Sequence, residues 1–143
     1  MHTAATQQHE NATPTYVVVI AWILRSVTAV ILLQTLFFKF SAAPESVYIF
    51  MKVHAEPWGR IGSGILELIA SVLILWPRFT WAGALIACGV MAGALLSHLT
   101  VLGIEVQGDG GLLFGLALTV LLSSVALLYI TWSQIPFVGG RLQ

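Results

Sequence analysis

Charged side chains are scarce in this sequence, and that scarcity limits the class of protein. Only 8% of the 143 residues are Asp, Glu, Lys or Arg, whereas soluble domains carry roughly 25%. Hydrophobic residues make up 58% of the chain, which is too many for a water-soluble fold to cover. The six Lys and Arg residues form no cluster, so nucleic acid is not an expected partner, because its binding needs several phosphate contacts. A small polytopic membrane protein fits this composition.

Cysteine is almost absent as well. Cys88 is the one cysteine, so the chain has no Cys-x-x-Cys redox pair and no intrachain disulfide. His54, Glu56 and His98 could converge with Glu105 and Asp109, but no His-x3-His or Glu-x-x-His spacing occurs. We therefore expect no metal site, no catalytic residue and no cofactor carried by the chain alone.

Four hydrophobic runs are long enough to cross a bilayer, which takes about 20 residues at helical rise. They cover residues 16–40, 58–76, 79–99 and 111–132. Their short links require antiparallel neighbours, and Asp109 is placed to cap the fourth run. The pattern predicts an all-α, integral-membrane four-helix bundle. We expect one domain over residues 16–133, after a disordered polar segment at 1–15 and before a short tail at 134–143.

The link between the first two runs has a pattern of its own. Val47, Phe50, Met51 and His54 recur at helical spacing, which predicts a short helix lying on the membrane surface. A plain loop is the alternative.

Small residues mark two faces suited to close helix packing, which membrane helices need because lipid is as apolar as their own side chains. The third run contains the GxxxG pair Gly89 and Gly93, and the fourth has Gly111, Gly115, Thr119 and Ser123 at four-residue spacing. We expect these two ridges to meet inside the bundle. A contact between copies of the chain is the alternative.

Of the Asp, Glu, Lys and Arg residues, only Arg25 and Glu67 lie deep within the runs, and His98 adds a third titratable group. Such residues usually face the bundle interior and pair. A simple arrangement pairs Arg25 with Glu67. The opposite mouth then groups Lys39, Glu56, His98, Glu105 and Asp109. Three interpretations remain open: a structural ion pair, a polar pocket for a headgroup, quinone or small substrate, and a proton relay. The candidate pocket is Arg25, Lys39, Glu67, His98 and Asp109.

The order of several short motifs between residues 16 and 128 resembles the DoxX-like family of small four-span bacterial membrane proteins. The matching positions are Arg25, Lys39-Phe40-Ser41, Ala43-Pro44-Glu45-Ser46, Glu56-Pro57, Arg60, Glu67, Pro77, Gly83-Ala84, Met91-x-Gly93-Ala94 and Ser97-His98-Leu99. One departure is Leu36, where many relatives have Gly three residues before the Lys.

The resemblance implies a four-span bundle and an association with redox or stress-response assemblies, since the family is named for a membrane subunit linked to thiosulfate:quinone oxidation. We expect a non-catalytic membrane subunit or accessory protein with a membrane protein partner, or a homo-oligomer, in contact with lipid. The alternative is a quinone-interacting oxidoreductase subunit that uses Glu67 and His98. A small-solute or proton carrier is the third. The expected location is a bacterial inner membrane, with both termini cytoplasmic.

Overall fold

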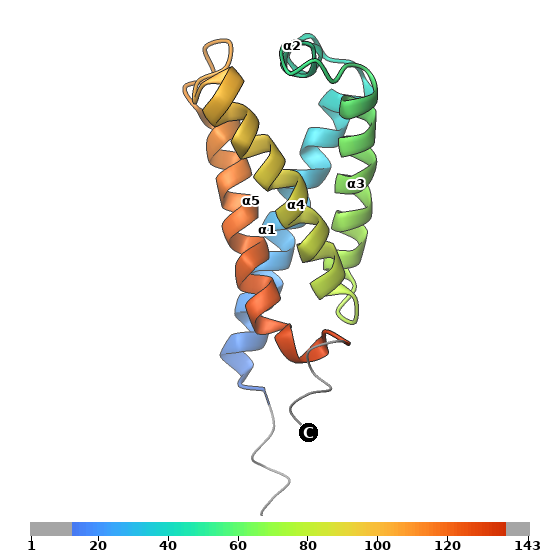
Figure 1. The fold of residues 1–143 in the computed structure, drawn as a ribbon. Helices are drawn as coiled ribbons and strands as arrows, with labels where there is room; N and C mark the ends of the chain where they lie inside the picture. The colour runs from blue at the N-terminus through green and yellow to red at the C-terminus, as the bar shows by residue number, and fades with distance from the viewer. Residues whose placement is uncertain (1–12, 137–143) are drawn as a thin grey trace, which may run out of the picture.

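The computed structural model describes residues 13–136, and this part of the chain is helical without strands. The elements run in the order α1 (Thr15–Phe40), α2 (Pro44–Lys52), α3 (Trp58–Leu75), α4 (Thr80–Ser97), η1 (His98–Leu102), α5 (Leu112–Ile130) and η2 (Trp132–Gln134). The predicted four-helix bundle is confirmed (Figure 1). The segments predicted at residues 1–15 and 134–143 lie largely outside the described residues.

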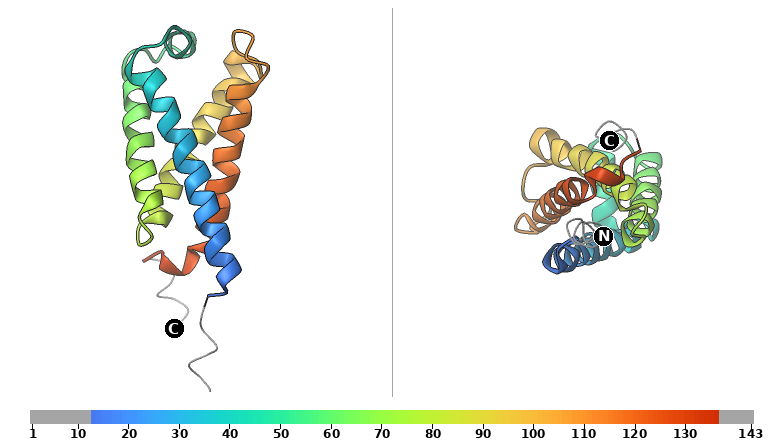
Figure 2. Two further views of the ribbon diagram at one scale, coloured as in Figure 1. Left: turned by 180° about the vertical axis from the view of Figure 1, so that it is seen from behind. Right: turned by 90° about the horizontal axis from the view of Figure 1, so that it is seen from below.

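The four long helices alternate in direction and pack in the ring α1–α3–α4–α5. We call the end that carries α2 and the α4–α5 connection the α2 end. The opposite end carries the start of α1, the α3–α4 turn and η2 (Figures 1 and 2), and we call it the η2 end. The predicted short helix in the first link is present as α2, so the loop alternative is wrong.

Proline and threonine set several helix boundaries. Pro44 occupies the first turn of α2 and Pro57 immediately precedes α3, positions where a missing backbone N–H costs little. In the α3–α4 turn, the Thr80 hydroxyl donates to the carbonyl oxygen of Ile74 at 3.1 Å. Thr80 is fully buried, so this bond satisfies a carbonyl that the end of α3 leaves without a helical partner.

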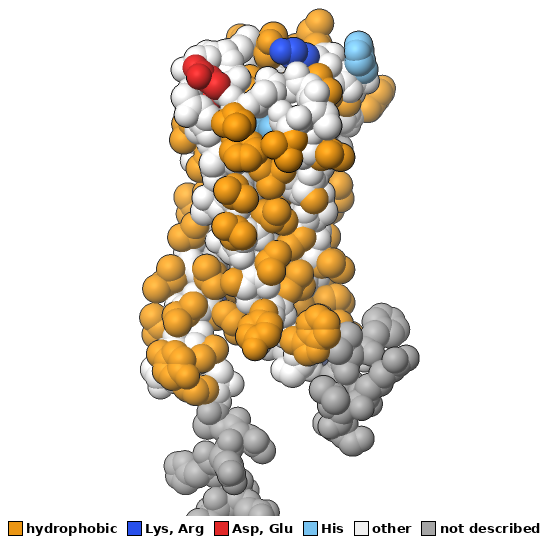
Figure 3. Space-filling model, turned by 60° about the vertical axis from the view of Figure 1, so that its left-hand side comes forward, with side chains coloured by type: hydrophobic (Ala, Val, Ile, Leu, Met, Phe, Trp, Pro, Cys, Tyr) orange, Lys and Arg blue, Asp and Glu red, His pale blue; other side chains and the backbone are white. Residues whose placement is uncertain are grey.

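The outer surface of the helices is hydrophobic, while charged side chains gather at the α2 end (Figure 3). All four long helices are long and apolar enough to cross a membrane. Large residues such as Ile23, Phe37, Leu85 and Leu122 are exposed, which in water would leave a large apolar surface uncovered. These are the properties of an integral membrane protein.

The helices approach most closely at a glycine outside the predicted ridges. A Cβ atom on Gly83 of α4 would lie 2.7 Å from the backbone oxygen of Ala70 and 2.7 Å from the backbone nitrogen of Ile74. At Gly89, Gly93 and Gly115 the same atom would meet nothing within 4 Å. The expectation that the two ridges meet in the bundle is therefore wrong at these glycines, because Gly89, Gly93 and Gly115 lie on exposed faces of α4 and α5.

Candidate functional site

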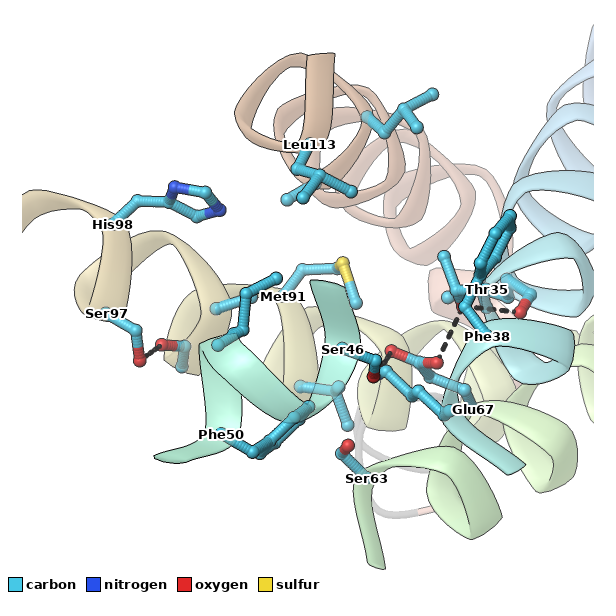
Figure 4. A pocket seen from close by; sticks show the side chains of 18 of the residues that line it. Thr35, Phe38, Ser46, Phe50, Ser63, Glu67, Met91, Ser97, His98 and Leu113 are labelled. Atoms are coloured by element: carbon cyan, nitrogen blue, oxygen red, sulfur yellow. Dashed lines mark hydrogen bonds and ion pairs between the residues drawn. The ribbon is translucent and has the colours of Figure 1, made fainter. Parts of the chain in front are cut away.

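A cavity of about 920 Å³ lies within the half of the bundle nearest the α2 end. Its walls are the last turns of α1 and α4 and the first turns of α3 and α5, and α2 borders it through Ser46, Ile49 and Phe50. Figure 4 shows Thr35 and Glu67 on one side and His98 on the other. The described structure thus places a single large hollow where the four spans diverge.

Most of the cavity wall is aliphatic or aromatic, and its polar groups come from a few positions. Of the five pocket residues predicted from sequence, Lys39, Glu67, His98 and Asp109 line the cavity, whereas Arg25 does not. Ser46, Ser63 and Ser97 add hydroxyl groups. The predicted site is therefore largely assembled, with one member elsewhere in the bundle.

Glu67 is almost completely buried and its two carboxylate oxygens have separate donors from α1. Lys39 Nζ lies 2.6 Å from Oε1, and the Thr35 hydroxyl donates to Oε2 at 2.8 Å. Opposite charge and a hydrogen bond together compensate the loss of hydration. The predicted pairing of Arg25 with Glu67 is wrong, because Lys39 is the partner.

The reason for this error is the relative depth of α1 and α3. The two helices meet at the α2 end, where a Cβ on Gly64 would lie 3.7 Å from the Cβ of Lys39. α1 has 26 residues and α3 has 18. Since they are level at Lys39 and Gly64, α1 extends farther toward the η2 end than α3 does. Arg25 consequently lies about four helical turns, or roughly 21 Å, from the level of Lys39.

Lys39 is held in place by contacts beyond its ion pair. Its ammonium group lies 5.7 Å from the centre of the Phe50 ring of α2, a cation–π arrangement. Its backbone oxygen accepts a hydrogen bond from Arg60 Nη1, and Arg60 Nη2 in turn lies 2.7 Å from Glu56 Oε1. These contacts join α1, α2 and α3 at the mouth of the bundle. An ammonium has three donors, so Lys39 retains N–H groups beyond the one that Glu67 accepts.

His98 stands where α4 gives way to the π-helical turn η1, a feature frequent at functional sites. Its Nδ1 lies 2.7 Å from the carbonyl oxygen of Gly103. A carbonyl can only accept, so Nδ1 carries a hydrogen, and Nε2 is an acceptor whenever the ring carries no second proton. No described residue hydrogen-bonds to Nε2, and the ring projects toward the cavity (Figure 4). This ring nitrogen is available to a ligand.

Asp109 has a structural role at the start of α5, as its predicted capping position indicates. Its Oδ2 accepts the N–H of Leu113 at 2.9 Å, and its Oδ1 accepts those of Val106 at 2.8 Å and Gly111 at 2.9 Å. Burial alone would raise the pKa of Asp109, but the three backbone donors and the nearby His98 outweigh it and leave this pKa below its ordinary value.

Some contributors to the site were not predicted. Helical spacing predicted that α2 is a surface helix but did not indicate which of its residues reach a site. Ser46, Ile49, Phe50 and Val53 line the cavity, whereas Met51 is 61% exposed. Among residues 13–136 no group of three or more His, Cys, Asp or Glu side chains could hold a metal ion. Comparison with protein-family models, curated protein sequences and solved structures gave no match for this chain.

The cavity combines an apolar interior with two hydrogen-bonding side chains, Lys39 and His98, that lie apart from each other. Lys39 offers charged N–H donors from α1, and His98 offers its Nε2 from the far wall. Glu67 is less available, since both of its oxygens already have donors. Such a site can bind and orient an amphiphilic molecule.

Proposed function

We propose that this protein is a non-catalytic integral-membrane subunit or accessory protein that binds one amphiphilic molecule in the cavity at its α2 end. The observation that carries the proposal is the cavity itself, about 920 Å³ in volume and lined on opposite sides by Lys39 and His98. Ligand sites are typically about 300–1,000 Å³, mostly apolar, with a few placed polar groups.

The chemistry of the walls favours a ligand that is already dissolved in the membrane. A purely polar solute would lie against aliphatic side chains such as Ile31, Leu66 and Leu116. It would lose its hydrogen bonds to water and gain none from these side chains. A purely apolar molecule would leave the donors of Lys39 unused. An apolar body with an oxygen-bearing head satisfies both parts of the cavity.

A quinone is the second candidate, and one relationship favours it over a simple lipid. A quinone in its reduced form carries hydroxyl groups on opposite sides of the ring, so one oxygen can accept from Lys39 while the other hydroxyl donates to Nε2 of His98. Lys39 is bound to Glu67, which lies across the cavity from His98 (Figure 4). The contact with a quinone oxygen that we expected from Glu67 is made by Lys39 in this arrangement, because the Glu67 carboxylate is paired with the Lys39 ammonium group. Electrons would come from a partner protein. Membership of the DoxX-like family, and a position in a bacterial inner membrane with cytoplasmic termini, stay predictions based on the sequence.

The test is to purify the chain in a mild detergent, extract it with organic solvent and identify the bound molecules by mass spectrometry. The proposal predicts one class of amphiphile in about equimolar amount. Lys39→Met and His98→Phe should each weaken its binding about tenfold, the loss expected for one charge-assisted or buried hydrogen bond. Lys52→Met is the control, because Lys52 is an exposed cation of α2 that does not line the cavity.

Two results would separate the candidates. Recovery of a quinone, with binding lost in His98→Phe, supports the quinone-linked subunit. Recovery of phospholipid alone supports the accessory role without a redox ligand. Retention of full binding in both cavity variants would contradict the proposed site.

A further inference from the structure

Arg25 is a buried cation that has no carboxylate partner in the described part of the chain. The residue is only 7% exposed, and its Nε has no hydrogen-bond partner there. The one contact recorded for its guanidinium group is with the ring of Trp22, whose centre lies 5.0 Å from Cζ. An isolated buried charge is costly, so this guanidinium is suited to an anion supplied from outside residues 13–136.

The depth of Arg25 indicates where that anion lies. Gly64 is level with Lys39, and α3 ends at Leu75, roughly 17 Å farther toward the η2 end. Arg25 lies roughly 21 Å from Lys39 in the same direction. It therefore lies roughly 4 Å beyond the end of α3, level with the α3–α4 turn that begins at Trp76, which is 59% exposed. Exposed Trp residues of membrane helices concentrate at the headgroup level.

The two ends of the bundle differ in the sign of the charge on their described side chains. All five described acids (Glu45, Glu56, Glu67, Glu105 and Asp109) lie in the half nearest the α2 end. At the η2 end the described ionisable groups include Arg25 and the exposed Arg78, whose guanidinium lies 5.9 Å from the Phe79 ring. Arg78 also borders a second, smaller hollow with Trp81 and Gln134. Among residues 13–136, the charged side chains of this end are therefore cations, and aromatic residues lie beside them.

We propose that Arg25 is a binding site for the phosphate group of an anionic phospholipid at the η2 end. The planar guanidinium matches two phosphate oxygens at once, and basic pockets between membrane helices are known recognition sites for anionic headgroups. Exposed Trp residues favour the interface of a bilayer, so we place Trp22 and Trp76 at the depth of the lipid ester region, with Arg78 adding attraction nearer the water. The site is separate from the cavity, whose lining does not include Arg25.

The experiment starts from delipidated protein in detergent and measures its thermal unfolding after adding one of three probes. These are phosphatidylglycerol, phosphatidylcholine with the same acyl chains, and sodium phosphate. The proposal predicts that phosphatidylglycerol raises the Tm more than phosphatidylcholine does, and that sodium phosphate has no comparable effect. Equal effects of the two lipids overturn the proposal without any variant. Full protection by sodium phosphate assigns the site to a free anion and also overturns it.

Single substitutions test whether Arg25 is the residue that binds phosphatidylglycerol. Arg25→Gln should weaken phosphatidylglycerol binding at least about tenfold, Arg78→Gln should weaken it less, and Lys52→Gln at the α2 end should leave it unchanged. If Arg25→Gln does not fold, Arg25→Lys keeps the charge without the planar fork and should still bind more weakly than the wild type. Unchanged lipid preference in the folded Arg25 variant overturns the proposal. The proposal is also overturned if Glu10→Gln lowers the Tm as much as Arg25→Gln does and phosphatidylglycerol has no effect on the Tm. Glu10 would then be the partner of Arg25.

Discussion

Lys39 of α1 and Glu67 of α3 form an ion pair of 2.6 Å in the half of the bundle that contains the cavity. Glu67 Oε2 is bonded to Thr35 as well, so the carboxylate has donors on both oxygens. The pair has two consequences. It fixes α1 against α3 beside the cavity, and it places an ammonium group at the cavity wall.

Breaking this pair should destabilise the protein more than removing a surface charge. Glu67→Gln leaves the Lys39 ammonium without its counter-charge, and removal of one member of a buried pair costs roughly 3–5 kcal/mol. The 14% exposure of the Lys39 side chain places the loss toward the lower value. Thermal unfolding in detergent measures it, and Lys52→Gln is the matched control.

A double-mutant cycle identifies the partner of Glu67. Lys39→Met combined with Glu67→Gln should show a coupling energy of at least about 1 kcal/mol, as residues in contact do. Arg25→Met combined with Glu67→Gln should be additive, because the two residues stand roughly 16 Å apart along the bundle. Coupling in the Arg25 cycle and additivity in the Lys39 cycle would show that the assigned pair is wrong.

Gly83 and Gly89 make a second comparison within one helix. In Gly83→Ala the new methyl group would press on backbone atoms of Ala70 and Ile74, and such overpacking costs about 1–3 kcal/mol. Gly89→Ala meets nothing and should be neutral or slightly stabilising, since Ala is the better helix former. Tm values of the two variants test this, and equal stability would contradict the close approach at Gly83.

Asp109 should make stability depend on pH. Its pKa is lower in the folded protein than its ordinary value, so its contribution is present above the unfolded pKa of about 4 and is lost as pH falls through the folded pKa. Asp109→Asn should remove that acid-dependent loss and lower stability at neutral pH by about 0.5–2 kcal/mol, the cost of a lost cap. Glu105→Gln, in the same connection, is the control for loss of a charge. An unchanged acid profile in Asp109→Asn would refute this role.

The four spans were predictable because run length and hydrophobicity are local properties of the sequence. The buried faces that carry Arg25, Glu67 and Ser71 were also predictable, since helical spacing decides which side chains share a face. Scarcity of charge directed attention to Glu67 and His98, and both line the cavity.

The partner of Glu67 was not predictable in the same way. It depends on how far one helix is displaced along another, and that displacement is set by α2 and by helix lengths rather than by the face. Gly89 and Gly93 illustrate a second limit. Small residues permit either a helix contact or a hollow, and here both line the cavity.

The central claim is that the cavity is a ligand site, and filling it tests that claim most directly. Gly93 lines the cavity, and a side chain added there meets no neighbour at its first carbon. Gly115→Leu is the matched control, because Gly115 is equally open but is not part of the cavity wall. Native mass spectrometry of the wild type and both variants would count bound amphiphile per chain. We predict that Gly93→Leu loses the bound molecule and Gly115→Leu keeps it. A Gly93→Leu variant that carries as much as the wild type would contradict the account.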